Sequence, residues 1–121
     1  MGRKRENPRE IGTVYENKAV LFLEEKGYQI LERNFYSKHG EIDIIAQDEE
    51  YLVFLEVKYR KNAYEGAALE AVNLAKRRRL IQAARYYLYK KYYLNMEIPC
   101  RFDVIAFEGE EIVHIINAFS L

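Results

Sequence analysis

The feature that most constrains this chain is a set of charged side chains inside two apolar stretches at residues 40–60. The segment reads GEIDIIAQDEEYLVFLEVKYR and predicts two β-strands, residues 41–46 and 51–59, joined by an acidic turn. Charged groups are costly on a buried sheet face unless they are paired or bind a metal ion. The hairpin therefore holds either a neutralised ion cluster or a reaction centre.

Strand parity predicts where these charges lie, because side chains two residues apart share a face. A turn centred between residues 47 and 50 places Asp43 opposite Phe54, and a slip of one pair places it opposite Glu56. Both registers bring Glu41, Asp43, Glu56 and Lys58 to one face. The aliphatic face is expected to consist of Ile42, Ile44, Ala46, Val53, Leu55 and Val57.

The rest of the chain predicts a single α/β domain at residues 9–121, preceded by a flexible basic arm at residues 1–8. Half of the 121 residues are hydrophobic, which is enough for one packed core. In chain order we expect a helix (9–26), three strands (28–37, 41–46, 51–59), a loop at 62–66, a second helix (67–93) and two strands (101–107, 112–118). This order, α-βββ-α-ββ, predicts a mixed central sheet flanked by helices.

The charges are segregated along the chain, although the formal net charge is zero. Residues 41–57 contain six acidic side chains and no basic one, whereas residues 76–91 contain seven basic side chains and no acidic one. A basic helix with tyrosines at its end suits nucleic-acid phosphates and bases, although a solvated helix face has the same composition. The candidate phosphate-binding residues are Lys76, Arg77, Arg78, Arg79 and Arg60.

The first helix carries an acid on its inner stripe. Glu16, Ala19, Val20 and Leu23 follow the spacing of a core-facing helix side, so Glu16 points toward the body of the protein. Two interpretations stay open for Glu16: a salt bridge at the helix edge, or a member of the acidic site.

Converging carboxylates are the hard oxygen ligands that Mg²⁺ or Mn²⁺ prefers. Asp43, Glu56 and the main-chain carbonyl of Val57 are the candidate ligands, with Glu41 as a further one. Such an ion activates water for phosphodiester hydrolysis, and Lys58 can hold that water and stabilise negative charge. The alternative is a structural ion-pair network, but one lysine cannot neutralise three acids.

The chain also resembles the YraN-type proteins, a bacterial group with a restriction-endonuclease-like fold related to archaeal Holliday junction resolvases. The residues that carry the resemblance are Glu16, Ala19, Gly27-Tyr28, Asn34-Phe35, Gly40-Glu41-Ile42-Asp43, Phe54, Glu56-Val57-Lys58, Arg60, Lys76, Arg101-Phe102-Asp103-Val104 and Asn117-Ala118-Phe119. The resemblance implies a nuclease-type metal site. The chain departs from the family pattern at Tyr15, where glycine is usual, and at Tyr36, where arginine is common.

Carried over residue by residue, the resemblance implies that Asp43 and Glu56 are metal ligands and that Lys58 is the catalytic lysine. It further implies that Glu16 completes the site and that Lys76 approaches the substrate backbone. Together with the residue patterns, it predicts a Mg²⁺- or Mn²⁺-dependent endonuclease acting on DNA, with branched DNA as one candidate substrate.

Two other classes of function stay open: a nucleic-acid-binding module without hydrolysis, and an adaptor whose acidic patch binds a basic partner. A homodimer is a candidate assembly, because resolving a junction requires two cuts. The single cysteine, the absence of a signal-peptide pattern and the absence of an apolar run of roughly 18 residues predict a cytoplasmic protein without membrane contact.

Overall fold

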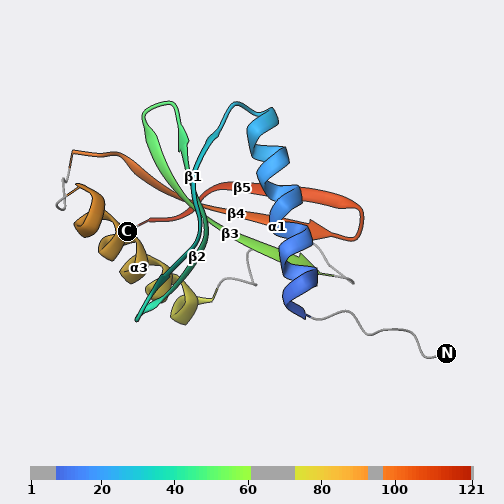
Figure 1. The fold of residues 1–121 in the computed structure, drawn as a ribbon, viewed down its shortest axis with the longest axis horizontal. Helices are drawn as coiled ribbons and strands as arrows, with labels where there is room; N and C mark the ends of the chain where they lie inside the picture. Colours follow the sequence, from blue (N-terminus) through green and yellow to red (C-terminus); the bar gives the residue numbers. More distant parts are fainter. Residues whose placement is uncertain (1–7, 61–72, 93–96, 121) are drawn as a thin grey trace.

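A mixed β-sheet with two helices forms the structure, a computed structural model that describes residues 8–60, 73–92 and 97–120. The elements are α1 (Pro8–Glu25), β1 (Gln29–Ser37), β2 (Gly40–Asp48), β3 (Tyr51–Arg60), α3 (Leu74–Tyr92), β4 (Cys100–Glu108) and β5 (Glu111–Phe119) (Figure 1). The strands lie in the order β1-β2-β3-β4-β5, and only β3 and β4 run parallel. The predicted α-βββ-α-ββ arrangement and mixed sheet are therefore confirmed.

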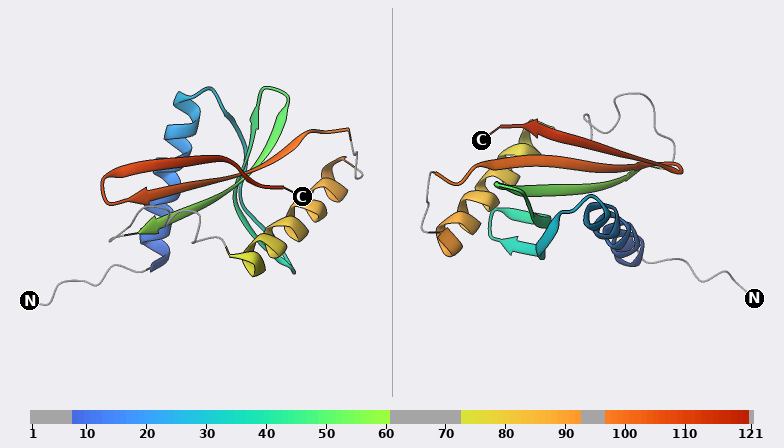
Figure 2. Two further views of the ribbon diagram at one scale, coloured as in Figure 1. Left: turned by 180° about the vertical axis from the view of Figure 1, so that it is seen from behind. Right: turned by 90° about the horizontal axis from the view of Figure 1, so that it is seen from above.

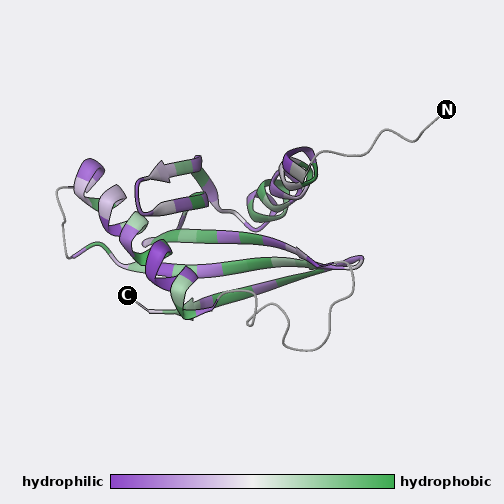
Figure 3. Ribbon diagram, turned by 90° about the horizontal axis from the view of Figure 1, so that it is seen from below, coloured by the Kyte–Doolittle hydropathy of each residue, from purple (hydrophilic) through white to green (hydrophobic). Residues whose placement is uncertain are grey.

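The two helices pack on opposite faces of the central strands (Figure 2). On β3, Leu52 and Phe54 belong to the cluster that contains α3, whereas Val53 and Leu55 belong to the cluster that contains α1. Because helices cover both faces of β3, the residues in the middle of this strand are hydrophobic on both sides. The side of α3 that faces away from the sheet is hydrophilic (Figure 3). The described residues contain no helix that is both long and apolar enough to cross a membrane.

Local signals explain where the helices begin and end. Gly27 has a φ of 91°. The amides of Gly27 and Tyr28 donate to the carbonyls of Glu24 and Leu23, which is a Schellman cap and confirms the predicted end of the first helix. At the start of α3, the Asn73 side chain accepts a hydrogen bond from the Lys76 amide, as an N-cap does.

Three predictions fall partly or wholly outside the described residues: the basic arm at 1–8, the loop at 62–66, and both ends, 67–72 and 93, of the second helix. Pro8, the last residue of the predicted arm, is described and is the first residue of α1. Among the residues that are described, α3 begins at Leu74 and not earlier. The predicted strands are confirmed within one to two residues at each end.

β2 and β3 pair over only half of their length. Their ladder runs from Asp48↔Tyr51 to Ile44↔Leu55, and extending it by one pair sets Asp43 opposite Glu56, the second of the two predicted registers. Beyond this point the first residues of β2 pair with β1, while the last residues of β3 pair with β4. The two strands therefore part where the charged residues lie.

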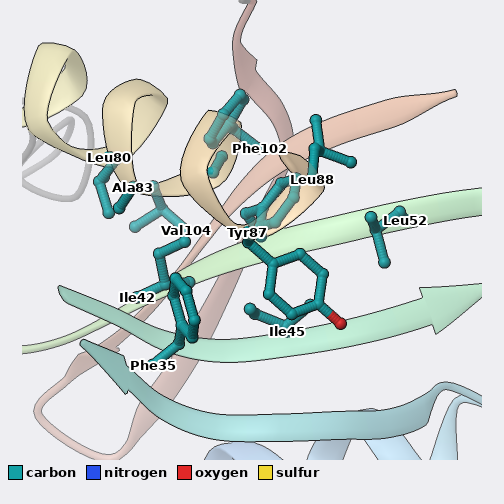
Figure 4. Close-up of a cluster of buried hydrophobic side chains, with 12 residues drawn as sticks. Phe35, Ile42, Ile45, Leu52, Leu80, Ala83, Tyr87, Leu88, Phe102 and Val104 are labelled. Atoms are coloured by element: carbon teal, nitrogen blue, oxygen red, sulfur yellow. The ribbon is translucent and has the colours of Figure 1, made fainter. Parts of the chain in front are cut away.

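The predicted aliphatic face of β2 is wrong at one residue. Ile42 packs with Ile45 in the cluster under α3 (Figure 4). Ile44 and Ala46 instead pack on the α1 side. The hairpin backbone is irregular beside this stretch: on β1, Asn34, between Arg33 and Phe35, which pair with Ile44 and Ile42, has a φ of 53°. Asparagine tolerates this left-handed conformation better than most residues. The strict alternation of side chains between the two faces of β2 therefore fails between Ile42 and Ile44.

Candidate functional site

A cluster of carboxylates and lysines occupies the point where β2 and β3 part. Asp43 comes from β2, Glu56 and Lys58 from β3, and Lys76 from the first turn of α3. The buried Glu56 carboxylate contacts both lysines, with its Oε1 3.1 Å from Lys58 Nζ and 2.5 Å from Lys76 Nζ. Asp43 Oδ2 accepts a 2.8 Å hydrogen bond from the Val57 amide. The predicted meeting of these groups is confirmed, and Lys76 joins them.

The pKa values of Asp43 and Glu41 are raised because these carboxylates are partly or largely buried and lie close to other carboxylates. Burial and the neighbouring Glu56 carboxylate raise the pKa of Asp43 from 3.8 to about 8. Burial, followed by the charges of Glu56 and Glu16, also raises the pKa of Glu41. An opposite charge at this point would favour the ionised form of all these acids, so the cluster is a good environment for a cation.

The two lysines respond in opposite directions. Burial and the neighbouring Lys76 lower the pKa of Lys58, despite the attraction of Glu56. Burial opposes the charged form of Lys76 as well, but the Glu56 carboxylate outweighs it and raises the Lys76 pKa. Lys76 is thus the lysine whose positive charge Glu56 stabilises, and Lys58 is the more readily deprotonated of the two amines. The sequence argument that a single lysine faces the acids is wrong, because α3 brings a second one.

The donor set fits a hard divalent cation through two carboxylates and one carbonyl. The N–H and C=O of a strand residue point to the same side of the strand, so the Val57 carbonyl faces the gap that its amide shares with Asp43. Mg²⁺ typically uses one or two protein carboxylates and completes its shell with water or substrate oxygens. Among the described residues, no three His, Cys, Asp or Glu side chains converge as a metal site by themselves.

Glu16 faces the sheet as predicted, and the salt-bridge interpretation is confirmed. Its Oε1 lies 2.8 Å from Arg33 Nε and 3.0 Å from Asn34 Nδ2. Glu16 also lines a cavity together with Asp43 and Glu41. Its role in completing a metal site stays a prediction.

Two hollows meet at the charged cluster. The larger, of about 800 Å³, lies on the α1 side, and the smaller, of about 380 Å³, lies on the α3 side. Glu41, Asp43 and Val57 line both of them. The smaller hollow also contains Glu56, Lys58, Lys76 and Arg79. A ligand at the carboxylates is therefore accessible from both faces of the sheet.

The predicted basic residues do not form one surface. Lys76 and Arg79, three residues apart on α3, both line the smaller hollow. The guanidinium of Arg77 instead lies 5.5 Å from the centre of the Phe119 ring on β5. The side chains of Arg78 and Arg60 are exposed. Lys76 and Arg79 are thus the basic residues of α3 that border the carboxylates.

Gly40 explains how α3 comes so close to the site. A Cβ atom added at Gly40 would lie 3.3 Å from both the Cβ and the carbonyl oxygen of Arg79. That spacing is tighter than ordinary van der Waals contact, and the nearest atoms belong to the helix backbone and its first side-chain carbon. Glycine at this position therefore permits the close packing of α3 on the start of β2.

Sequence reasoning missed most of the larger hollow. Besides the acids, that hollow is lined by Arg9, Ile11, Gly12, Thr13, Tyr15, Asn34, Tyr36, Val57 and Tyr59. Asn34 and Tyr36 alternate on β1, and Val57 and Tyr59 alternate on β3, so parity was the available signal. It was not sufficient, because the hollow depends on how α1 crosses the separated strands.

Comparisons with known proteins give a consistent family assignment. A sequence model of the family described as "Uncharacterised protein family UPF0102" matches residues 15–107. The UPF0102 protein of Lachnoclostridium phytofermentans is 48% identical over 109 residues, which cover 90% of this chain and 92% of the relative. The UPF0102 protein of Vibrio parahaemolyticus is 46% identical and that of Fusobacterium nucleatum 44% identical, with coverage of 93% and 92% of both chains, respectively.

Proposed function

Since the chain belongs to the uncharacterised protein family UPF0102, whose name states no activity, we propose its function from the site itself: divalent-metal-dependent hydrolysis of DNA phosphodiesters. The observation that carries the proposal is the convergence of Asp43, Glu56 and Lys58 at the parting of β2 and β3. Two hard-oxygen ligands beside an amine are the parts that metal-assisted phosphodiester hydrolysis needs.

Asp43, Glu56 and the Val57 carbonyl are the groups proposed to hold Mg²⁺ or Mn²⁺, with Glu41 as a further candidate and Glu16 assisting from α1. When bound, the ion polarises a phosphoryl oxygen and lowers the pKa of the attacking water. The raised pKa of Asp43, about 8, supports this role, because a cation would offset both the burial and the Glu56 repulsion that raise it.

Lys58 is proposed to orient the attacking water and to stabilise the negative charge that develops on the phosphoryl oxygens. The water oxygen forms a bond to phosphorus and gives up a proton, while the bond from phosphorus to the leaving sugar oxygen breaks and that oxygen takes up a proton from solvent. The lowered pKa of Lys58, caused by burial and Lys76, supports a part in handling the water's proton.

Lys76 and Arg79 are proposed to bind the DNA backbone beside the scissile bond, because both line the hollow that contains Glu56 and Lys58. Lys76 can exchange the Glu56 carboxylate for a phosphate once a metal ion neutralises Glu56. Arg77, Arg78 and Arg60 lie farther along the surface and are proposed as weaker phosphate contacts. Two copies of the chain acting together remain the candidate assembly for cutting both strands.

One observation favours a second candidate, a DNA-binding module without hydrolysis. Glu56 is already contacted by Lys58 and Lys76, so an ion cluster can be balanced without a metal ion. In that case the site would be a structural network, and DNA would bind at the basic residues alone.

Calorimetry with Mn²⁺ and a cleavage panel separate the two candidates. The panel consists of branched, nicked, linear and single-stranded DNA with Mg²⁺ or Mn²⁺. We expect the natural chain to bind Mn²⁺ and cleave at least one substrate, Asp43→Asn to lose both properties, and Lys58→Ala to lose cleavage but keep the metal. Lys38→Ala, in the exposed β1–β2 turn, is the matched control. The absence of Mn²⁺ binding by the natural chain would reject the hydrolytic mechanism.

A further inference from the structure

The larger hollow has two aromatic walls. On one side the Tyr15 ring of α1 stacks on the Tyr59 ring of β3, with centroids 4.1 Å apart and planes 15° from parallel. Phe107 supports this pair, with its ring centre 5.0 Å from that of Tyr15. On β1, Tyr36 lines the same hollow with 68% of its surface exposed, the largest value among the exposed large hydrophobic side chains of the described residues.

The charges divide the space around the carboxylates into two environments. Glu41 and Asp43 line both hollows. The α1-side hollow adds Glu16 and Arg9, whereas the α3-side hollow adds Glu56 together with three basic side chains, Lys58, Lys76 and Arg79. The α3-side hollow therefore offers three cationic side chains to phosphate oxygens, whereas the α1-side hollow is lined mainly by acids and aromatic rings. A nucleobase is neutral and needs no cationic partner, so the α1-side hollow suits a base better than it suits a phosphate.

The size of the α1-side hollow suits such an occupant. Its volume of about 800 Å³ lies within the range of roughly 300–1,000 Å³ that is typical of small-ligand pockets. Aromatic side chains hold single-stranded bases by stacking, and a base inside an intact duplex cannot reach a hollow of this kind without leaving its stack.

We propose that the hollow between Tyr36 and the Tyr15–Tyr59 pair receives an unpaired base next to the phosphodiester held at Asp43 and Glu56. This inference rests on the proposed function and names its substrate class: DNA with an unpaired nucleotide beside the bond to be cut. Tyr36 is the face on which the base stacks, and Asn34 Oδ1 and the Glu16 and Glu41 carboxylates are acceptors near its edge.

The experiment measures binding without requiring cleavage. The probe is a short DNA oligonucleotide with one 2-aminopurine, a base whose fluorescence falls when it stacks. It is titrated with the full chain, once with the probe base unpaired and once in a perfect duplex, in chelator and again in Mn²⁺. We expect tighter binding and stronger quenching for the unpaired base.

Substitutions test the residues. Tyr36→Ala should weaken binding of the unpaired probe about tenfold, the scale of one lost base–aromatic stack, while Tyr36→Phe keeps the affinity. Tyr89→Ala, which removes a tyrosine 61% exposed on α3, is the matched control and should change nothing. Gly12→Leu should block the hollow and Gly12→Ala should not, because a Cβ at Gly12 meets no atom within 4 Å.

The outcomes separate this inference from the proposed hydrolysis. Equal binding of paired and unpaired probes, or an unchanged affinity in Tyr36→Ala, overturns the base site even if the chain cleaves DNA. Tyr36-dependent binding of the unpaired base together with no cleavage of any DNA leaves the base site standing and rejects the proposed hydrolysis. Loss of binding in Tyr89→Ala as well would show a general aromatic effect and would overturn the assignment to this hollow.

Discussion

Asp43 and Asp103 are both acids within the sheet, yet their surroundings differ in almost every respect. The Asp103 side chain is fully buried and accepts hydrogen bonds from Arg101 Nε at 2.9 Å, from His114 Nε2 at 2.8 Å and from the Asn117 amide at 2.9 Å. Asp43 accepts a bond from the Val57 amide and otherwise faces carboxylates, with Glu56 within hydrogen-bonding reach. One acid is surrounded by donors, and the other by further acids.

The pKa values record the difference. Burial alone would raise the pKa of Asp103, but the hydrogen bonds from His114, Arg101 and Asn117 lower it. Burial and Glu56 raise the pKa of Asp43. Fully satisfied buried networks stabilise a fold, whereas perturbed acids beside a cavity are typical of functional sites. We infer that the Arg101–Asp103 network maintains the structure and that the Asp43–Glu56 cluster acts on a ligand.

The Arg101–Asp103 network also joins elements that are distant in sequence. We therefore expect the largest loss of unfolding free energy when it is disrupted. Arg101 donates to Asp48 at the end of β2 and to the Tyr28 hydroxyl after α1. Asp103→Ala would leave the guanidinium of Arg101 with fewer partners and the Asn117 amide without its acceptor. We expect the free energy of unfolding, measured with urea, to fall by about 3–5 kcal/mol.

Glu110→Ala, in the exposed β4–β5 turn, is the control and should change the free energy of unfolding by less than about 0.5 kcal/mol. A loss in Asp103→Ala that is no larger than in this control would mean that the network does not maintain the fold. The structural role inferred for Asp103, in contrast to Asp43, would then be wrong.

The sequence predicted one of these regions better than the other, for a physical reason. Asp43, Glu56 and Lys58 lie on neighbouring strands of one hairpin, so strand parity and turn length were enough to bring them together. Lys76 was not predicted to reach Glu56, because that contact depends on how closely α3 packs. Asp103 was predicted to be a hydrogen-bonded structural group, which is confirmed. Its network also includes Tyr28 and Asp48. Their contacts with Arg101 were not predicted, because these residues lie far from Arg101 in the sequence.

Irregular backbone limited the prediction further. Parity put Ile42 on the wrong face at a place where the neighbouring strand is irregular, with Asn34 in a left-handed conformation that strict alternation does not include. The larger hollow exists because β2 and β3 separate, and no residue pattern marks where a ladder ends. The order of elements and the mixed sheet were predictable, since they follow from hydrophobic periodicity and short connections.

Gly40 tests whether the carboxylate cluster depends on the position of α3. Gly40→Ala forces a methyl group against the backbone of Arg79, so α3 has to move away from β2. We expect the unfolding free energy to fall by about 1–3 kcal/mol, as for overpacked sites, and the affinity for Mn²⁺ to change with it. The measurements are urea unfolding and calorimetry.

Gly12→Ala is the matched glycine control. Its Cβ meets open space within α1, so it should raise the unfolding free energy by roughly 0.5–1 kcal/mol through helix propensity alone. Equal effects of the two substitutions would show that the close contact of Gly40 with Arg79 is unimportant. A fall in unfolding free energy for Gly40→Ala and a rise for Gly12→Ala, as expected here, would show that the position of α3 determines the geometry of the carboxylate cluster.

The dependence of the unfolding free energy on pH tests the contrast through its sign. Because the folded pKa of Asp43 is raised from 3.8 to about 8, the folded chain binds this proton more tightly than the unfolded chain does. The stability linked to that proton is fully present below pH 3.8 and is lost as the pH rises to about 8. Asp43→Asn keeps an acceptor for the Val57 amide and removes the charge. Without divalent ions, it should therefore exceed the natural chain in unfolding free energy at pH 8, and by less at pH 5.

Asp103→Asn should show the opposite dependence on pH. The folded pKa of Asp103 is lowered, so its contribution is present above the unfolded value of 3.8 and is lost as the pH falls through the folded value. The deficit of Asp103→Asn should accordingly shrink in acid, while the advantage of Asp43→Asn grows toward pH 8. Added Mn²⁺ should reverse the sign for Asp43→Asn alone, because only the natural chain gains binding energy there. Parallel pH profiles for the two variants would mean that the two acids do not differ in the way their surroundings imply.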